Sequence, residues 1–152
     1  MYYFSYTPSI CPLWILANET GIVKISFSKL IGKAIEKETS LIKQAMTQIE
    51  EYLEGRRKVF DFPMDPQGTT FQKNVWSILQ QIPYGETWSY KQVAIAVGNP
   101  NASRAVGMAN NKNPLPIVVP CHRVIGANGK LTGYAGGLDV KERLLDLEQK
   151  HV

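Results

Sequence analysis

A cysteine followed at once by a histidine and an arginine is the part of this sequence best suited to chemistry. Cys121, His122 and Arg123 come after Pro120 at the end of an apolar, β-branched run that starts at Ile117. A thiol attacks as the thiolate, and neighbouring cationic or basic groups favour that form. The segment therefore predicts a strand that delivers a nucleophilic cysteine.

Other interpretations of Cys121 compete with this one. A lone cysteine is more often a small buried hydrophobe. A structural zinc ion needs three or four ligands, and the chain offers only Cys11, Cys121, His122 and His151, without ligand-like spacing, so we expect no metal. A disulfide between the two cysteines stays open, although the absence of a signal peptide favours a reducing compartment. The adjacent histidine and arginine favour the nucleophile.

Length and composition indicate an ordinary soluble protein. With 152 residues, the chain can bury one core, or one core and a small satellite domain. Its hydrophobic fraction of 44% and charged fraction of 20% are typical of globular domains. No apolar run approaches the roughly 18 residues of a membrane span. We therefore expect no association with a membrane and an intracellular, cytoplasmic location.

The positive charge is concentrated in the second half of the chain. The net charge is +4. Residues 1–65 carry eight basic and eight acidic side chains, whereas residues 66–152 carry nine basic and five acidic ones. Between Thr69 and Tyr134, Glu86 is the only acid. This asymmetry suits a polyanionic partner such as DNA.

The first part of the chain is typical of a small β-sheet with one helix. Met1–Tyr6 and Leu13–Ala17 are aromatic and apolar runs, and alternating residues follow in 23–27. Ser40 can cap a helix with a 3.6-residue period that ends at Gly55. We place a linker at 62–68, and hence domains at 1–65 and 66–152. The fold class is α+β, with the sheet-plus-helix domain preceding a mainly helical one.

The second part predicts a helix-turn-helix. A helical stripe runs from Phe71 to Ile82, and Ser89 with Gln92 forms a capping box for the next helix. That helix ends at 98–100, and another follows at 102–110, where small residues surround the single long cation Arg104. Small side chains let a helix approach a groove closely. Two ordinary core-packed helices fit the pattern about equally well.

The proton acceptor for Cys121 is less clear from the residues. If 120–123 stay extended, Cys121 and His122 point to opposite faces, so a water molecule or a local bend must relay the proton. Asp139 is predicted to cap a last helix with Glu142 in its first turn. Asp146 and Glu148 on that helix are both candidates to hold the imidazole, and their spacing does not choose between them.

Five segments together resemble one family. The sequence around Cys121 is similar to the active-site signature of the O6-alkylguanine-DNA alkyltransferases (methylated-DNA–protein-cysteine methyltransferases). Four other segments match the family in order and spacing: Tyr84-Gly85-Glu86-Thr87-Trp88-Ser89-Tyr90, Ser103-Arg104-Ala105-Val106-Gly107, Asn113-Pro114-Leu115-Pro116 and Gly133-Tyr134-Ala135-Gly136-Gly137-Leu138. The resemblance covers about residues 69–148 strongly and the amino-terminal part loosely.

The resemblance implies a role for each residue of the reaction centre. Cys121 would accept the alkyl group from O6 of a flipped-out guanine. His122 would deprotonate the thiol through a bound water, with Glu148 orienting the imidazole. Tyr90 would help to rotate the nucleotide and would donate to the base as O6 departs. No cofactor is implied.

The resemblance also implies the contacts to DNA. Arg104 would enter the base stack in place of the flipped base, with its helix in the minor groove of double-stranded DNA. Asn113 would tie that helix to the active-site turn, and backbone groups near Val124 and Ala135 would read the guanine edge. Three further residues are assigned to substrate or DNA binding: Ser103, Arg123 and Tyr134. We expect a monomer. Each molecule should react once, because no cellular thiol reduces a thioether as it would a disulfide.

Two alternative functions remain open. One is an alkyltransferase-like protein that binds the lesion without reacting, but such proteins carry another residue at the position of Cys121. The other is a Cys-His hydrolase of acyl substrates, which would leave the helix-turn-helix and the basic surface unexplained.

Overall fold

Two compact units make up the computed structural model, which describes residues 1–29 and 32–152. The units are Met1–Gln67 and Gly68–Val152. The division falls between Gln67 and Gly68, where sequence analysis places it between residues 65 and 66. The α+β fold class predicted from the sequence is confirmed.

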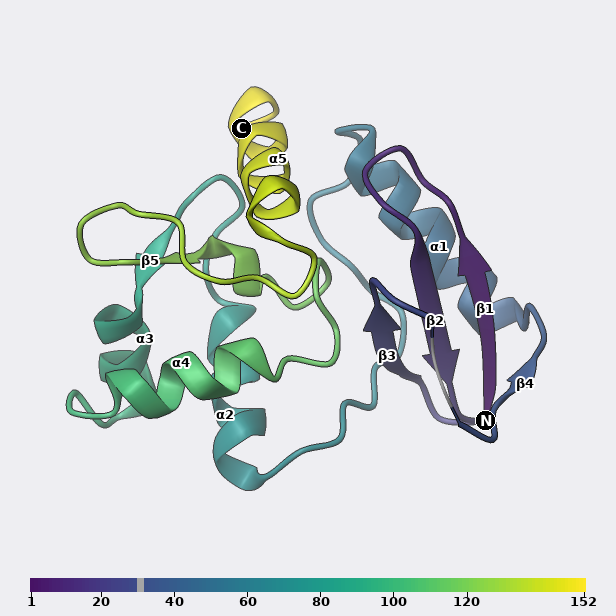
Figure 1. Cartoon of the computed structure of the whole chain (residues 1–152), viewed down its shortest axis with the longest axis horizontal. Coiled ribbons are helices and arrows are strands. Elements are labelled where there is room, and N and C mark those ends of the chain that lie inside the picture. Colours follow the sequence, from purple (N-terminus) through teal and green to yellow (C-terminus); the bar gives the residue numbers. More distant parts are fainter. Residues whose placement is uncertain (30–31) are drawn as a thin grey trace. The chain divides into compact units, whose positions relative to one another are not determined.

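The first unit is built on a four-stranded sheet (Figure 1). Strands β1 (Tyr2–Tyr6), β2 (Leu13–Ala17) and β3 (Ile22–Ser26) form antiparallel pairs in the order β3-β2-β1. The short β4 (Ile35–Glu36) pairs parallel to β1. β2 is an unbroken apolar run, which the sequence predicts well as a strand, whereas β4 is short and exposed and gives no such signal.

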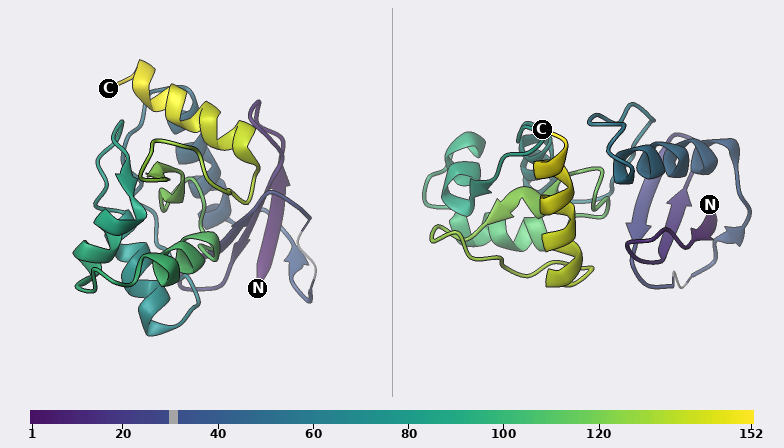
Figure 2. Two further views of the ribbon diagram at one scale, coloured as in Figure 1. Left: turned by 60° about the vertical axis from the view of Figure 1, so that its left-hand side comes forward. Right: turned by 90° about the horizontal axis from the view of Figure 1, so that it is seen from above.

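Helix α1 (Ser40–Leu53) lies across one face of this sheet (Figure 2). Its buried apolar residues recur at helical spacing: Ile42, Ala45, Met46 and Ile49. The cap is Thr39, whose hydroxyl accepts from the Ile42 amide at 3.2 Å. The prediction of Ser40 as the cap is therefore wrong by one position, because either hydroxyl suits the role and Thr39 holds the extended conformation that a cap needs.

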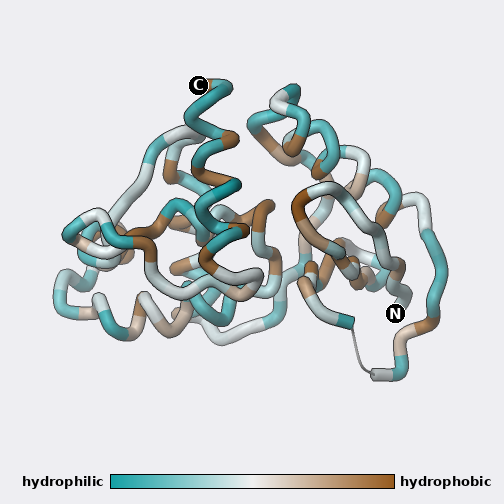
Figure 3. Tube along the Cα trace, turned by 45° about the horizontal axis from the view of Figure 1, so that its top comes forward, coloured by the Kyte–Doolittle hydropathy of each residue, from teal (hydrophilic) through white to brown (hydrophobic). Residues whose placement is uncertain are grey.

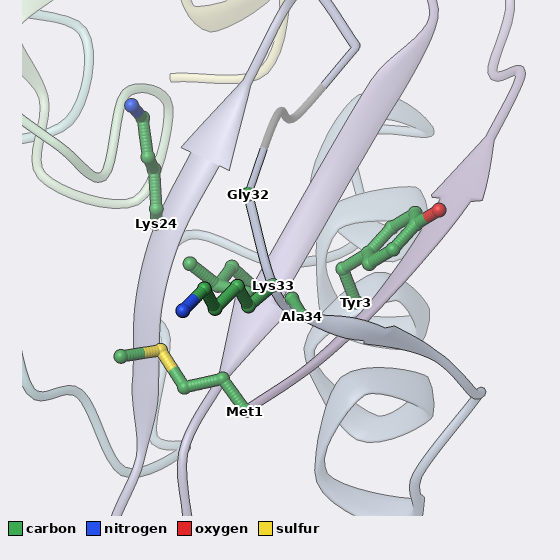
Figure 4. Close-up of a pocket in the computed structure, with 7 residues that line it drawn as sticks. Met1, Tyr3, Lys24, Gly32, Lys33 and Ala34 are labelled. Carbon is green, nitrogen blue, oxygen red and sulfur yellow. The ribbon is translucent and has the colours of Figure 1, made fainter.

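A hollow beside the sheet is lined by flexible side chains, among them Lys24 and Lys33 (Figure 4). Its lining residues include no thiol, imidazole or carboxylate. The hollow therefore offers no counterpart to the Cys121–His122 pair of the second unit.

Helices begin in the second unit where hydroxyl caps are available. α2 (Thr70–Leu79) starts at a capping box between Thr69 and Gln72, and α3 (Tyr90–Val97) starts at one between Ser89 and Gln92. Each box satisfies two backbone donors that the first turn leaves unpaired. The second box fixes the start of α3 directly at Tyr90.

A helix-turn-helix follows, as predicted. α3 ends at Gly98, whose φ of 95° is the left-handed conformation that glycine adopts easily, and α4 (Ser103–Asn111) begins after a short turn. The indole Nε1 of Trp76 in α2 donates to the Ala109 carbonyl at 2.9 Å. This bond ties α4 to the interior of the unit and leaves its other face exposed.

The last helix, α5 (Leu138–Lys150), is amphipathic, with hydrophobic positions recurring among hydrophilic ones (Figure 3). Its cap is Gly137, and Asp139 lies inside the first turn with no capping bond. The predicted Asp139 cap is wrong because the helix begins at Leu138, one residue before it. Val140 and Leu144 anchor the helix in the core. Among the described residues, no helix combines the length and the apolar character needed to cross a membrane.

The apolar run before Cys121 is a buried turn, not the predicted strand. Ile117 has a φ of 74°, the Val119 amide donates to the Leu115 carbonyl at 2.8 Å, and Cys121–Arg123 form one turn of 3-10 helix. The prolines at 114, 116 and 120 lack the amide donors that a strand would use. The run is β-like in composition because it is buried. Only Val124–Ile125 (β6) pairs as a strand, parallel to β5 (Trp88–Ser89).

Candidate active site

Asn113 shapes the turn that presents the thiol. Its Nδ2 donates to the Val119 carbonyl at 2.8 Å, and its Oδ1 accepts from the Leu115 amide at 3.0 Å. The same side chain forms a hydrogen bond with Cys121. One amide thus holds both the backbone and the sulfur in place just beyond the end of α4.

The Cys121 thiol is held in its neutral form at rest. It is only 5% exposed, and burial raises its pKa to about 11. The hydrogen bond from Asn113 and the positive charge of Lys141 oppose this rise. Because the thiol is protonated near neutral pH, a base must assist its reaction.

A buried histidine and glutamate lie in the same unit as the thiol. His122 Nε2 lies 2.7 Å from Glu148 Oε2, and both side chains are buried. The structure therefore distinguishes the two acids left open by spacing, since Asp146 is exposed and Glu148 contacts the imidazole. Residues 121–123 form a 3-10 turn and are not extended. The argument that the thiol and the imidazole must point to opposite faces therefore no longer applies.

The protonation states of this pair follow from their surroundings. Burial lowers the pKa of His122, and the adjacent carboxylate opposes the shift only in part. Burial alone would raise the pKa of Glu148, but hydrogen bonds from His122 and Arg123 outweigh it and hold that pKa well below its usual range. Glu148 is thus an ionised acceptor, so His122 donates through Nε2–H and keeps Nδ1 as its basic nitrogen.

Arg123 is part of this interior cluster. Its Nε and Nη2 donate to Glu148 at 2.8 and 2.9 Å, and its Nη1 donates to the Ile82 carbonyl at 2.8 Å. The guanidinium also lies over the Tyr84 ring at 5.6 Å. With 7% exposure, Arg123 does not fit the DNA-binding role assigned from the sequence. Its placement fits neutralisation and positioning of Glu148.

Acidification is expected to destabilise the protein through this cluster. The folded-state pKa of His122 lies below its ordinary 6.5, and that of Glu148 lies below its ordinary 4.5. In both cases the unfolded chain binds more protons, so the stability falls as the pH drops below about 6.5 and falls further below about 4.5. Urea unfolding at pH 7.5, 6.5 and 5.5 measures the first step.

His122→Gln is the matched control for the pH experiment. Glutamine does not titrate, so the loss of stability between pH 7.5 and 5.5 should be smaller in this variant. Equal pH slopes for the variant and the wild type would contradict a neutral buried His122.

A small pocket opens beside the thiol. Eight residues line it: Asn110, Asn111, Asn113, Pro116, Cys121, Gly133, Tyr134 and Ala135. The Tyr134 ring stands edge-on to the His122 ring, with centroids 6.5 Å apart. The glycine-rich loop therefore forms one wall of the pocket, and the end of α4 with the following turn forms another.

A buried lysine that was not identified from the sequence, Lys141, lies close enough to Cys121 for its charge to act on the thiol. Lys141 is fully buried, and its Nζ donates to the Val124 carbonyl at 2.7 Å and to the Thr132 carbonyl at 3.2 Å. The Tyr90 hydroxyl also meets Thr132, through the threonine hydroxyl. One signal could have identified Lys141, because it shares a helical face with Leu144 and Glu148 at spacings of three and seven residues.

The remaining predicted residues lie on the surface. Arg104 is exposed and Ser103 is half-buried, both at the start of α4. The structure does not bring Arg104 into the buried cluster. The exposed face of α4 carries Arg104, Ala105, Met108 and Asn111, and the exposed Lys112 follows directly at the end of the helix. Within the described ranges, no group of three or more histidine, cysteine, aspartate or glutamate residues could hold a metal ion.

Comparison with known proteins matches both units to domains of one family. Residues 70–150 match the model of the 6-O-methylguanine DNA methyltransferase DNA binding domain, and residues 1–66 match that of the ribonuclease-like domain. A methylated-DNA–protein-cysteine methyltransferase of Methanosarcina acetivorans is 51% identical over 97% of this chain and 98% of its own length. The constitutive enzyme of Bacillus subtilis is 48% identical over 82% of this chain and 76% of its own.

A solved structure supports the fold in detail. The crystal structure of Mycobacterium tuberculosis OGT in complex with DNA superposes with a TM-score of 0.91 at 40% identity, covering 99% of this chain and 94% of that one.

With its helix-turn-helix and its buried cysteine, this chain is a DNA repair methyltransferase. The chain belongs to the 6-O-methylguanine DNA methyltransferase family, which confirms the resemblance seen in the sequence.

Proposed function

We propose that this protein repairs DNA by moving the alkyl group of O6-alkylguanine, typically a methyl group, onto its own Cys121. The observation that carries the proposal is the placement of a buried thiol on a pocket, in the same unit as a neutral histidine that a carboxylate orients at 2.7 Å. The reaction is inferred from the family, and the roles of Cys121, His122 and Glu148 are inferred from their positions in the structure.

His122 supplies the base that the thiol needs. Its Nδ1 accepts the proton of Cys121 through a water, while Glu148 stabilises the imidazolium that forms. The thiolate sulfur then attacks the alkyl carbon, the bond from that carbon to O6 breaks, and its electron pair stays on the guanine. The base takes up a proton and is released repaired. The product on the protein is a thioether, so each molecule reacts once.

Guanine recognition falls to groups around the pocket. Backbone groups near Val124 and Ala135 would read the base edge, and the proposal is supported by Tyr134 and Ala135 lining the pocket beside Cys121. Tyr90 stands at the start of α3 and donates its hydroxyl proton to the departing base. Asn113 holds the turn that carries the thiol and so ties the end of α4 to the active site.

The partner is double-stranded DNA that holds the lesion as a flipped-out base. Reaction at O6 requires the nucleotide to leave the stack, at a cost of a few kcal/mol. The exposed face of α4 combines Arg104 with small residues, and Lys112 adds a second cation just after the helix, a surface that fits the minor groove. Arg104 fills the gap in the stack, and Ser103 contacts the backbone beside it. We infer that the protein acts as a cytoplasmic monomer.

Intact mass spectrometry tests the proposal directly. After incubation with O6-methylguanine DNA, the protein mass should rise by one methyl group and no more, and peptide mapping should locate it on Cys121. Methylation of Cys11, or hydrolysis of a thioester substrate with turnover in place of methylation, would reject the assignment.

Arg104→Ala is expected to slow repair of duplex DNA by about 10-fold or more, because the variant cannot fill the space left by the flipped base. Reaction with free O6-benzylguanine requires no flipping, so its rate should stay near that of the wild type. Lys112→Ala, which removes another exposed cation close to the end of α4, is the matched control for charge. An equal loss on both substrates would mean that Arg104 supports the pocket instead.

A further inference from the structure

Asn110 carries a buried polar atom that the described part of the chain leaves unsatisfied. The residue is 3% exposed, and its side-chain oxygen Oδ1 accepts no hydrogen bond from any residue that the structure describes. The other buried polar and charged side chains of these residues all form hydrogen bonds: Gln48, His122, Arg123, Lys141 and Glu148. Buried acceptors in folded proteins are nearly always satisfied. The exception indicates a donor that is not part of the chain.

The unsatisfied oxygen belongs to a residue of the pocket beside the thiol. Asn110 lines this pocket together with Cys121 and Ala135. It lies on the buried face of α4, one turn after Val106 and close to the end of the helix. Its backbone carbonyl accepts from the Asn113 amide at 3.3 Å. Backbone groups thus hold the end of the helix, and the side chain is available to a molecule in the pocket.

The lesion offers one kind of donor to this oxygen. An amide oxygen can only accept hydrogen bonds. In O6-alkylguanine the alkyl group leaves the ring without a proton on N1, so the ring nitrogens N1, N3 and N7 are acceptors. Inside a DNA strand the deoxyribose and the phosphates carry no donor either. The exocyclic amine at C2 is therefore the only N–H or O–H donor of the flipped nucleotide.

The edge of the base also fits this placement. On guanine, O6 and the C2 amine lie on the same edge, with N1 between them. Enzymes that flip a base read this edge through hydrogen bonds. Because Cys121 and Asn110 line one pocket, a base that turns this edge inward presents its alkyl group to the sulfur and its amine to the amide oxygen.

We propose that Asn110 Oδ1 accepts a hydrogen bond from the C2 amine of the flipped base, and thereby makes the protein selective for alkylated guanine over alkylated thymine. This inference rests on the proposed function. O4-alkylthymine has no N–H donor, since its N3 carries no proton and its oxygens only accept. Such a base leaves Oδ1 unsatisfied, and a site built to bond an N–H group rejects an analogue that lacks it.

A double-mutant cycle that removes the amine from the base and the oxygen from the residue tests this contact. Two duplexes differ only in the lesion, which is O6-methylguanine or O6-methylhypoxanthine, a base with hydrogen at C2. Asn110→Leu has a side chain of similar size that cannot accept. Single-turnover methylation of Cys121 is measured for each pair. The preference for O6-methylguanine should be at least about 10-fold greater in the wild type than in Asn110→Leu.

The design separates this contact from other effects. Differences in how readily each base leaves the duplex are the same for both proteins, so they cancel in the comparison. Asn110→Ala removes the oxygen without bulk and should lose the same preference. Asn111→Leu is the matched control, because it makes the same change at the next residue, where the side chain is exposed. Any weaker groove contact in that variant applies to both duplexes, so it should keep the wild-type preference.

Two results would overturn the inference. One is an equal preference in the wild type, Asn110→Leu and Asn110→Ala, which would mean that a water molecule satisfies Oδ1. The other is the same loss of preference in Asn111→Leu. A wild-type protein that accepts no methyl group from either duplex would instead reject the proposed function, so the two failures are distinguishable.

Discussion

Cys121→Ser is expected to abolish methyl transfer completely while leaving the affinity for duplex DNA unchanged. The serine hydroxyl is a far weaker nucleophile at neutral pH, and neither His122 nor Lys141 can compensate for that. The side chain is almost fully buried and serine is close to it in size, so the exposed face of α4 and its groove contacts stay intact. Transfer of a labelled methyl group and electrophoretic mobility shifts measure the two properties.

Cys11→Ser is the matched control, because it removes the only other thiol of the chain. This variant should accept one methyl group per molecule, like the wild type. If Cys121→Ser retained measurable transfer, or if Cys11→Ser lost it, the acceptor would have been assigned to the wrong cysteine.

Glu148→Gln should produce the second largest effect, because one carboxylate serves both His122 and Arg123. The neutral amide cannot stabilise the imidazolium that forms when the thiol loses its proton. Near neutral pH, methylation should slow by about 100-fold, the scale of a lost general base. The rate should recover partly as the pH rises toward the Cys121 pKa of about 11, where the thiolate forms without help.

The same substitution should destabilise the fold. Arg123 would keep its charge in the interior without a counterion, and breaking a buried ion pair in this way typically costs about 3–5 kcal/mol. Urea unfolding at pH 7.5 measures this loss, and the kinetics are run well below the melting temperature. Asp146→Asn is the control, since that carboxylate is exposed two residues earlier in α5. A slow, pH-rescued Asp146→Asn beside a normal Glu148→Gln would contradict the assignment.

The sequence predicts best those elements whose local patterns are strong. The capping box at Ser89 marks the start of α3 correctly, and Gly98 marks its end. The apolar run in 13–17 gives β2 with the same bounds. Errors at Ser40 and Asp139 are shifts of one or two positions where several residues could serve as a cap. Local sequence patterns thus predict that a helix or strand is present more reliably than they predict its first residue.

The candidate site contains the features that local patterns could not supply. A buried β-branched run suggests a strand in 117–120, but three prolines and the amide of Asn113 shape it into a turn. Arg123 looks like a DNA contact because arginines are usually exposed, and only the fold reveals that it is enclosed with Glu148. Lys141 was missed for the same reason. Partners distant in the sequence decide where each of these cations lies.

The hydrogen bond from Trp76 to the Ala109 carbonyl means that the fluorescence of this tryptophan can report on the position of α4. The chain has three tryptophans, and replacing Trp14 and Trp88 by phenylalanine leaves the indole of Trp76 as the sole emitter. Because that indole is buried and bonded to the backbone of α4, its emission wavelength responds to any displacement of this helix. Stopped-flow fluorescence could then follow groove binding and lesion extrusion in real time, without a dye attached to either partner.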